Sequence, residues 1–283
     1  MSVKPIREYA GKMIMQALYP EDLGLQACLV SPETLAKPDP WKTLADEYPW
    51  LLEKKLVVKP DQLVKRRGKH GLVYVNKTYD EVKAWIEERM NKEIKIDTAT
   101  GLLTHFIIEP ATPHKDEEEI YVCIQSHRYF DEVFFYHEGG VDVGDVDAKA
   151  LRMNIDVEAA IDKQKVIDDL MKEIPAGKKE KMATFVCNLY TDVFLKAHFT
   201  YLEINPVVMT DTQIVPLDCA AKLDETAAFL AEPLWQGCEF PAAFGRAAYP
   251  EEKFIADMDA KTGASLKLTI LNIHGNVWTM VAG

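Results

Sequence analysis

A lysine and a basic, glycine-containing loop could together hold the phosphates of a nucleotide. Lys59 follows the apolar run Leu56–Val58, and the loop Lys65–Gly71 comes shortly after it. A lysine ammonium is a point charge for phosphate, arginine offers forked donors, and glycine lets backbone amides approach an anion closely. The loop lacks the spacing of a Walker A motif, so the local pattern also fits a solvated basic surface.

Two oxygen-bearing side chains farther along the chain could ligate Mg²⁺. Asn205 and Asp218 each end a strand-like run, Tyr201–Asn205 and Ile214–Asp218. Because side chains alternate along a strand, Glu203 and Asn205 share a face, and a neighbouring strand could bring Asp218 beside them. Mg²⁺ takes one or two oxygen ligands from a protein and the rest from phosphates and water. The spacing alone fits equally well with polar side chains that are satisfied within a sheet.

A proline-flanked segment between these two features could receive a base and a ribose. Residues Glu109–Pro113 form a rigid connection, and a base could lie against the backbone of such a segment. In the acidic run Asp116–Glu119 that follows, a carboxylate such as Glu119 could accept the ribose hydroxyls. Such a run is also typical of plain protein surface.

The segment His137–Lys149 combines two adjacent glycines with acidic residues at positions 142, 145 and 147. This pattern predicts a strand or loop pressed against another backbone. A histidine can be a nucleophile or a base, but His137 ends an apolar strand and has no evident partner to orient it. We therefore expect His137 to be structural.

These candidate residues require a mixed α/β fold to position them. Apolar runs at strand spacing predict a mostly antiparallel sheet after residue 102, and the capping-box pattern Thr78–Glu81 opens a helix with a buried face. The predicted strands cover 55–59, 71–75, 102–110, 120–127, 132–140, 201–205 and 214–218, with two more within 266–283. The predicted helices cover 1–18, with the apolar stripe Ile6, Tyr9, Met13 and Ala17, 78–90, 157–172 and 178–196, whereas 241–262 is predicted to be a loop.

Composition and charge exclude several classes of function. The net charge of −12 over 283 residues repels polyanions and argues against nucleic acid as a partner. No apolar run approaches the roughly 18 residues of a membrane-spanning helix, and charges are mixed among the first apolar positions, so neither a secretory signal nor a membrane partner is expected. Five scattered cysteines without a C-x-x-C pair predict reduced thiols and a cytoplasmic protein.

The motifs occur in an order that resembles the amino-terminal region of the ATP-citrate lyases. The similarity runs from about Ile6 to Gly283, and more distantly it extends to the β subunit of succinyl-CoA synthetases. Where the synthetases have G-R-G and L-D-G-K patterns, this chain has RRG and LDCAAK, which favours the lyase family. The segments that carry the resemblance are VVKPDQLVKRRGKHGLV, IIEPATPHKDEEEIYVCI, HEGGVDVGDVDAK, YLEINPVV, PLDCAAKLD, FGRAAYPEE and DMDAKTGASLKLTILN.

The resemblance implies an α/β (α+β) ATP-grasp fold of two subdomains, followed by the start of a flavodoxin-like citrate-binding domain. The larger subdomain is expected to comprise 1–18 and 111–245, and the smaller one 19–110. Residues 246–283 are expected to form a linker and the first strands of the citrate-binding domain, whose citrate site would need residues beyond these.

The resemblance also assigns roles to individual residues. Lys59 would hold the phosphates, with Arg67 and Gly68 closing the loop over them, while Pro110 and Thr112 would line the adenine pocket and Glu119 would hold the ribose. Asn205 and Asp218 would ligate the catalytic Mg²⁺. A second, structural cation is expected at the loop formed by Asp259, Thr262 and Ala264.

The implied function is the use of Mg-ATP to phosphorylate a histidine that lies outside this chain, so no catalytic residue is expected within it. In the complete enzyme, citrate and CoA would become acetyl-CoA and oxaloacetate. The expected partner is a subunit or region that carries the phosphohistidine and a citryl-CoA lyase module, in a hetero- or homo-oligomer. Two alternatives are a subunit of a citryl-CoA or succinyl-CoA synthetase, which does not cleave the thioester, and a non-catalytic ATP-grasp assembly module.

Overall fold

The computed structural model describes residues 3–19, 23–97, 99–140, 144, 146–210, 212–235, 237–245, 248–262 and 266–280. The chain forms two compact units, Met1–Phe244 and Gly245–Gly283, each with its own contacts. The described residues of the first unit form three sheets, of which the two larger ones have separate hydrophobic cores, and every pair of strands in the three sheets is antiparallel. The predicted antiparallel arrangement is therefore confirmed.

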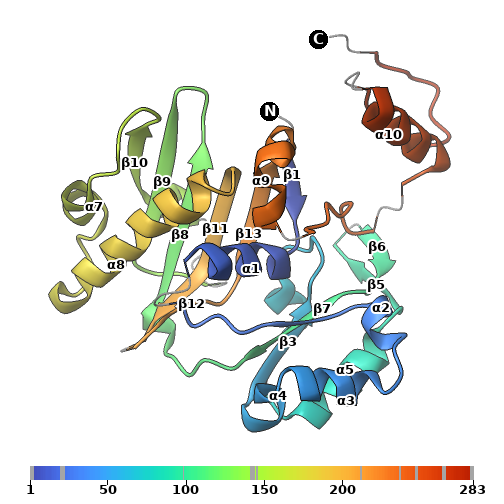
Figure 1. Ribbon diagram of the computed structural model, residues 1–283, viewed down its shortest axis with the longest axis horizontal. Coiled ribbons are helices and arrows are strands. Elements are labelled where there is room, and N and C mark those ends of the chain that lie inside the picture. Colours follow the sequence, from blue (N-terminus) through green and yellow to red (C-terminus); the bar gives the residue numbers. More distant parts are fainter. Residues whose placement is uncertain are drawn as a thin grey trace. The chain divides into compact units, whose positions relative to one another are not determined.

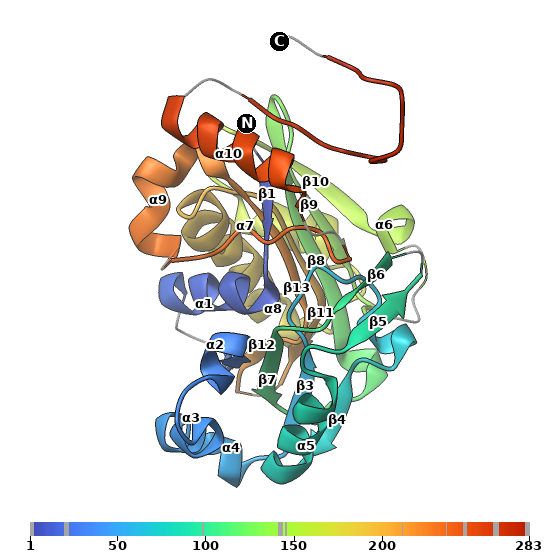
Figure 2. The same cartoon turned by 90° about the vertical axis from the view of Figure 1, so that its right-hand side faces the viewer.

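The larger sheet has seven strands, and Figure 1 shows it beside the smaller sheet of the first unit. Its order is β1 (Val3–Ile6), β13 (Cys219–Asp224), β11 (Phe199–Met209), β8 (Glu119–Ser126), β9 (Phe130–Tyr136) and β10 (Leu151–Asp156), with β12 (Ile214–Pro216) paired to β11. Helices cover one side of it, as Figure 2 shows for α1 (Glu8–Leu18), α8 (Ala176–Asn188) and α9 (Ala228–Trp235).

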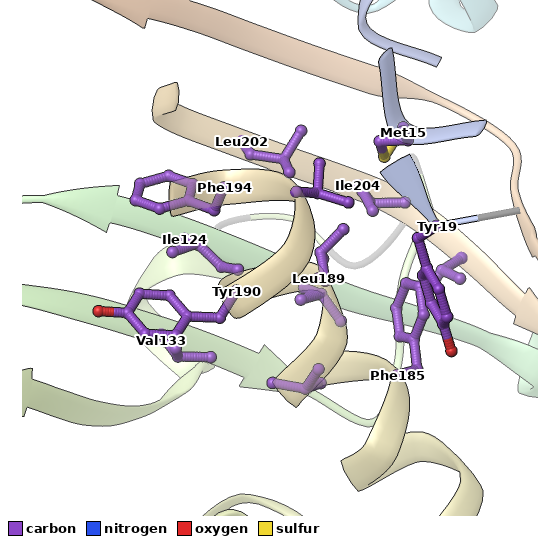
Figure 3. Packing of buried hydrophobic residues seen from close by; sticks show 14 of the residues in the cluster. Met15, Tyr19, Ile124, Val133, Phe185, Leu189, Tyr190, Phe194, Leu202 and Ile204 are labelled. Carbon is purple, nitrogen blue, oxygen red and sulfur yellow. The ribbon is translucent and has the colours of Figure 1, made fainter. Parts of the chain in front are cut away.

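Side chains from these helices and strands meet in the larger core (Figure 3). Phe185 of α8 stacks on Tyr19 with ring centroids 6.4 Å apart. From β11, Leu202 and Ile204 point into the same core because alternate residues of a strand share a face. The π-helical segment η3 (Leu189–Leu195) continues α8 and adds further aromatic rings.

The smaller sheet has the order β2 (Cys28–Val30), β7 (Phe106–Pro110), β3 (Leu56–Pro60) and β4 (Tyr74–Lys77). Its helices are α2 (Pro32–Leu35), α3 (Pro40–Glu47), α4 (Trp50–Glu53) and α5 (Tyr79–Arg89), and the hairpin β5 (Glu93–Ile96) and β6 (Ala99–Leu102) follows α5. Helix α5 begins with the predicted capping box, in which the Glu81 amide donates to Thr78 Oγ1 and Glu81 accepts from the Thr78 amide. The subdomain boundaries drawn from the sequence stay a prediction.

The first predicted helix is wrong in two respects. Residues 3–6 form an edge strand paired with β13, and the helix begins only at Glu8. Pro5 lacks a backbone N–H, and an edge strand tolerates this because one of its sides has no partner strand. Within α1, Ala17 is exposed, whereas the charged Glu8 and Lys12 are buried. The predicted apolar stripe is therefore not the buried face of this helix.

Several other boundaries also differ from the prediction. The helix predicted at 157–172 is shorter in the structure, where α7 covers Lys163–Leu170 and strand β10 precedes it. Asp162 caps the start of α7 by accepting from two backbone amides. Helix α8 begins at Ala176, before the predicted helix 178–196, so that Gly177 lies inside it. Strand β4 begins later than the predicted strand 71–75, and β13 was not predicted. The remaining helical turns are η1 (Arg67–His70), η2 (Asp116–Glu118), α6 (Val146–Lys149) and η4 (Glu225–Ala227).

The second unit differs most from the prediction. Helix α10 (Pro250–Thr262) occupies the predicted loop, and Pro250 with Glu251 and Glu252 suits the start of a helix. The described residues 266–280 contain no strand, and the large side chains of Leu271 and Trp278 are 93% and 82% exposed. The predicted strand pair has no sheet to join within the described chain. No described helix is long and apolar enough to cross a membrane.

Candidate functional site

A cavity of about 300 Å³ lies in the first unit, where the smaller sheet and its basic loop face the strands β11 and β12. Apolar side chains such as Val57, Val73 and Val215 form part of its wall. All eight residues that the sequence assigns to the nucleotide and its Mg²⁺ line this one cavity, namely Lys59, Arg67, Gly68, Pro110, Thr112, Glu119, Asn205 and Asp218. The structure therefore brings together residues that are up to 159 positions apart (218 minus 59).

Lys59 is held at the end of β3 by three acceptors. Its Nζ donates to the carbonyl oxygen of Leu217 at 2.5 Å, and it lies 2.7 Å from Glu8 Oε1 and 3.2 Å from Glu109 Oε2. The side chain is only 7% exposed, so these contacts are made away from bulk water. The ammonium is thus fixed at one wall of the cavity.

Arg67 comes from the basic loop and joins the two walls of the cavity. Its Nη1 donates to the carbonyl oxygen of Pro60 at 2.8 Å, while Nη2 donates to Glu8 Oε2 and to Asp218 Oδ1, each at 2.6 Å. Burial alone would lower the pKa of Arg67, but the charges of Asp218 and Glu8 raise it above its ordinary value. Arg67 therefore stays charged, and the predicted solvated-surface alternative does not apply to it.

Two buried charges of this site, Glu8 and Lys12, were missed in the sequence. Burial would raise the pKa of Glu8, but Arg67, Lys12 and Lys59 together hold it well below its usual range. Burial would lower the pKa of Lys12, which Glu109 and Glu8 instead raise. The signal that could have revealed them is the i,i+4 spacing of Glu8 and Lys12, which puts both on one face of α1.

Asn205 and Asp218 lie side by side on the wall that faces the basic loop. The backbone N–H of Asn205 donates to the backbone carbonyl oxygen of Asp218 at 3.3 Å, and the backbone N–H of Leu217 donates to the carbonyl oxygen of Pro206 at 2.9 Å. The Gly140 amide donates to Asn205 Oδ1 at 2.8 Å, which orients this side chain. A carboxylate and an amide oxygen beside cationic groups fit a Mg²⁺ that takes its remaining ligands from phosphate and water. Among the described residues no group of three His, Cys, Asp or Glu could hold a metal by itself.

The glycines of the segment 137–149 approach strand β8 closely. A Cβ at Gly139 would come within 2.9 Å of the Ile120 backbone, so the prediction of a segment pressed against another backbone is confirmed there. The acidic residues Asp142 and Asp145, and the side chain of Asp147, lie outside the described part of the chain. His137 follows β9 and does not line the cavity. Its Nε2 lies 3.8 Å from Glu138 Oε1.

The hinge between the two sheets contains a histidine that was not predicted to belong to the site. His114 Nδ1 lies 2.7 Å from the Thr112 carbonyl oxygen, and Nε2 lies 3.1 Å from Glu119 Oε1. His114 thereby ties the Thr112 backbone to the carboxylate of Glu119, and all three line the cavity. In the sequence, the signal that could have pointed to His114 was its position two residues after Thr112.

Two of the three residues predicted to bind a second cation lie in a helix, not in the predicted loop. Asp259 and Thr262 belong to the last turns of α10, where Asp259 accepts from the Leu266 amide at 2.8 Å and Thr262 donates to the Met258 carbonyl at 2.8 Å. Ala264 lies outside the described residues. Cation binding at these positions stays a prediction.

Comparison with known families gives two matches that together cover most of the chain. The family described as ATP-citrate synthase ATP-grasp domain matches residues 2–235. The family described as ATP citrate lyase citrate-binding matches residues 246–283.

Individual relatives agree with the family matches. The chain is 48% identical to the ATP-citrate synthase of Bos taurus over its whole length, but it covers only 26% of that protein. It is 43% identical to the probable ATP-citrate synthase subunit 2 of Schizosaccharomyces pombe, covering 87% of this chain and 56% of the relative. The solved structure of the ATP citrate lyase from Methanothrix soehngenii in complex with citrate and coenzyme A superposes with a TM-score of 0.82 at 38% identity, covering all of this chain and 66% of the other.

Proposed function

This chain belongs to the family of ATP-citrate synthase ATP-grasp domains, and from that premise we propose that its cavity binds Mg-ATP for the first step of citrate activation. In that step ATP phosphorylates a histidine outside this chain. The observation that carries the proposal is the convergence of Lys59, Arg67, Asn205 and Asp218 on one cavity. Cations and Mg²⁺ ligands in one pocket are what transfer of a phosphoryl group requires.

Each wall of the cavity has a separate task in this proposal. Lys59 and Arg67 hold the phosphates, and the loop at Gly68 closes over them. Pro110 and Thr112 receive the adenine, and Glu119 accepts the ribose hydroxyls in the orientation that His114 gives it.

On the facing wall, Asn205 and Asp218 hold the Mg²⁺, which neutralises phosphate charge when it is bound. Asp218 is suited to this because its side chain is 43% exposed, so one oxygen can face the ligand while the other stays with Arg67.

The complete enzyme would be an ATP-citrate lyase, in which citrate and CoA become acetyl-CoA and oxaloacetate. The chain spans 26% of the bovine relative, and the Methanothrix structure carries citrate and coenzyme A according to its description. We therefore assign citrate, CoA and the phosphohistidine to the complete assembly, with a partner subunit or region that carries the lyase module. The description of the fission-yeast relative as subunit 2 supports a hetero-oligomer as one form of this assembly.

The two alternatives are less well supported. Both family matches name ATP-citrate synthase or lyase, which disfavours a succinyl-CoA synthetase subunit. The complete set of cavity residues disfavours a non-catalytic assembly module.

All five cysteines are free of disulfides, which supports the cytoplasm as the compartment.

The proposal is tested in the complete enzyme that contains this chain. With labelled ATP, phosphohistidine should form in the wild type and be abolished by Lys59→Ala, because Lys59 is the cation at the phosphate end of the cavity. The exposed Lys196→Met variant serves as the matched lysine control. Normal phosphorylation in the Lys59→Ala enzyme would refute the assignment. Accumulation of citryl-CoA instead of acetyl-CoA and oxaloacetate would identify a synthetase.

A further inference from the structure

Two lysines share one set of acceptors behind the cavity wall. Lys12 Nζ lies 2.5 Å from Glu109 Oε1, 2.7 Å from Glu8 Oε1 and 3.0 Å from the Leu217 carbonyl oxygen. Lys59 contacts the same two carboxylates and the same carbonyl. Lys59 lines the cavity, whereas the side chain of Lys12 is fully buried and does not line it.

The charge of Lys59 is already engaged in this arrangement. Its Nζ donates a hydrogen bond to the Leu217 carbonyl and forms ion pairs with Glu8 Oε1 at 2.7 Å and with Glu109 Oε2 at 3.2 Å. To bind a nucleotide, Lys59 must therefore turn away from at least one of these acceptors. Arg67 would still contact Glu8, but without Lys12 that movement would leave the mostly buried Glu109 carboxylate without a cation, which is strongly unfavourable.

Lys12 removes this obstacle because it already contacts every acceptor that Lys59 would release. We propose that Lys12 is a positioning residue for nucleotide binding, which keeps Glu8 and Glu109 neutralised while Lys59 moves from them to the phosphates. This inference rests on the proposed binding of Mg-ATP in the cavity. It gives a role in ligand affinity to a side chain that never touches the ligand.

The balance of charge in the cluster makes the idea quantitative. The ion pairs join three cations, Lys12, Lys59 and Arg67, to three carboxylates, Glu8, Glu109 and Asp218, so the cluster is neutral. Lys12→Met leaves one excess negative charge and makes Lys59 the sole cation at Glu109. Lys12→Met combined with Glu109→Gln restores neutrality and frees Lys59 from one carboxylate.

The test is calorimetric titration of the 283-residue chain with Mg-ADP. Lys12→Met should weaken binding by about tenfold or more, as expected for one unscreened buried charge near the phosphates. The double variant Lys12→Met/Glu109→Gln should recover most of that loss. The control is Lys196→Met, which removes an i,i+4 pair of the same 2.7 Å length at an exposed site and should bind like the wild type.

A second variant covers the case in which Lys12→Met does not fold, as judged by its melting curve. Glu109→Gln alone should tighten Mg-ADP binding, because it releases Lys59 and leaves the cluster with an excess positive charge. Unchanged or weaker binding by Glu109→Gln overturns the proposal. A folded Lys12→Met that binds within twofold of the wild type also overturns it, as does a loss that the double variant does not repair. If the folded wild type binds no Mg-ADP, the proposed function itself fails as well.

Discussion

Asp61 should make the stability of this protein depend on pH in a way that one substitution removes. Its side chain is fully buried beside the charge cluster, where Oδ1 accepts from the Tyr9 amide at 3.2 Å. Oδ2 has no hydrogen-bond partner among the described residues. Burial, followed by the negative charge of Glu8, raises the pKa of Asp61 from 3.8 to about 6, against the opposing charges of Arg67 and Arg7.

The sign and size of the effect follow from the difference in pKa. The folded state binds the proton more tightly, so the stabilisation by protonated Asp61 is complete below pH 3.8 and is lost as pH rises through about 6. At about 1.4 kcal/mol for each pH unit by which a pKa moves, the loss is about 3 kcal/mol. Glu8, whose pKa is lowered, acts in the opposite direction below pH 4.5, so a wild-type curve alone mixes the two groups.

Comparison with Asp61→Asn isolates Asp61, because asparagine does not titrate. We would measure the free energy of unfolding of both proteins by urea denaturation between pH 4 and pH 7. The stability of the wild type relative to the variant should fall by about 2.5 kcal/mol across this range, because part of the full effect lies below pH 4. Any constant effect of the substitution cancels in this comparison. Parallel curves would show that Asp61 does not carry a raised pKa and would refute the reasoning.

Three further substitutions test other parts of the structure. Phe185→Ala removes a fully buried ring from the larger core and should lower the free energy of unfolding by about 3–5 kcal/mol in urea denaturation; a loss below 1 kcal/mol would contradict its packing against Tyr19. Thr78→Ala removes the cap of α5 and should lower the free energy of unfolding by about 1 kcal/mol in the same assay; an unchanged urea midpoint would contradict this. Arg67→Lys keeps the charge but loses the fork that joins Pro60, Glu8 and Asp218, so the free energy of unfolding should fall by about 2–3 kcal/mol. A neutral effect would contradict the role of the fork in joining these three residues.

Local patterns in the sequence predicted the local structure well. The capping box at Thr78 formed as expected because both of its partners lie within one turn of the helix. Strands β8 and β9 were found because each is a nearly continuous apolar run, whereas β10 and β13, in which buried and exposed residues alternate, were missed. Predictions failed where the outcome depends on distant partners, as at residues 266–280, whose apolar side chains have no sheet to join in the described chain.

The candidate site was predicted unevenly for a physical reason. Its order of motifs led to eight residues that the structure gathers in one cavity, although their roles as ligands stay a prediction. Glu8 and Lys12 escaped notice because a buried charge is recognisable only with its partners, and the partner Glu109 lies 97 positions from Lys12. Hydropathy places such residues at the surface by default. His114 was missed because its partners, a backbone carbonyl and the carboxylate of Glu119 at the start of β8, are recognisable only in the folded chain.

The central claim is that the cavity holds a nucleotide together with Mg²⁺. It is tested most directly by calorimetric titration of the 283-residue chain with ADP and with ATP, each with and without Mg²⁺, beside the Lys59→Ala variant. Binding that depends on Mg²⁺ in the wild type and is lost in a folded Lys59→Ala chain is the predicted result. Equal binding by the two proteins, or no binding by the folded wild type, would contradict the claim.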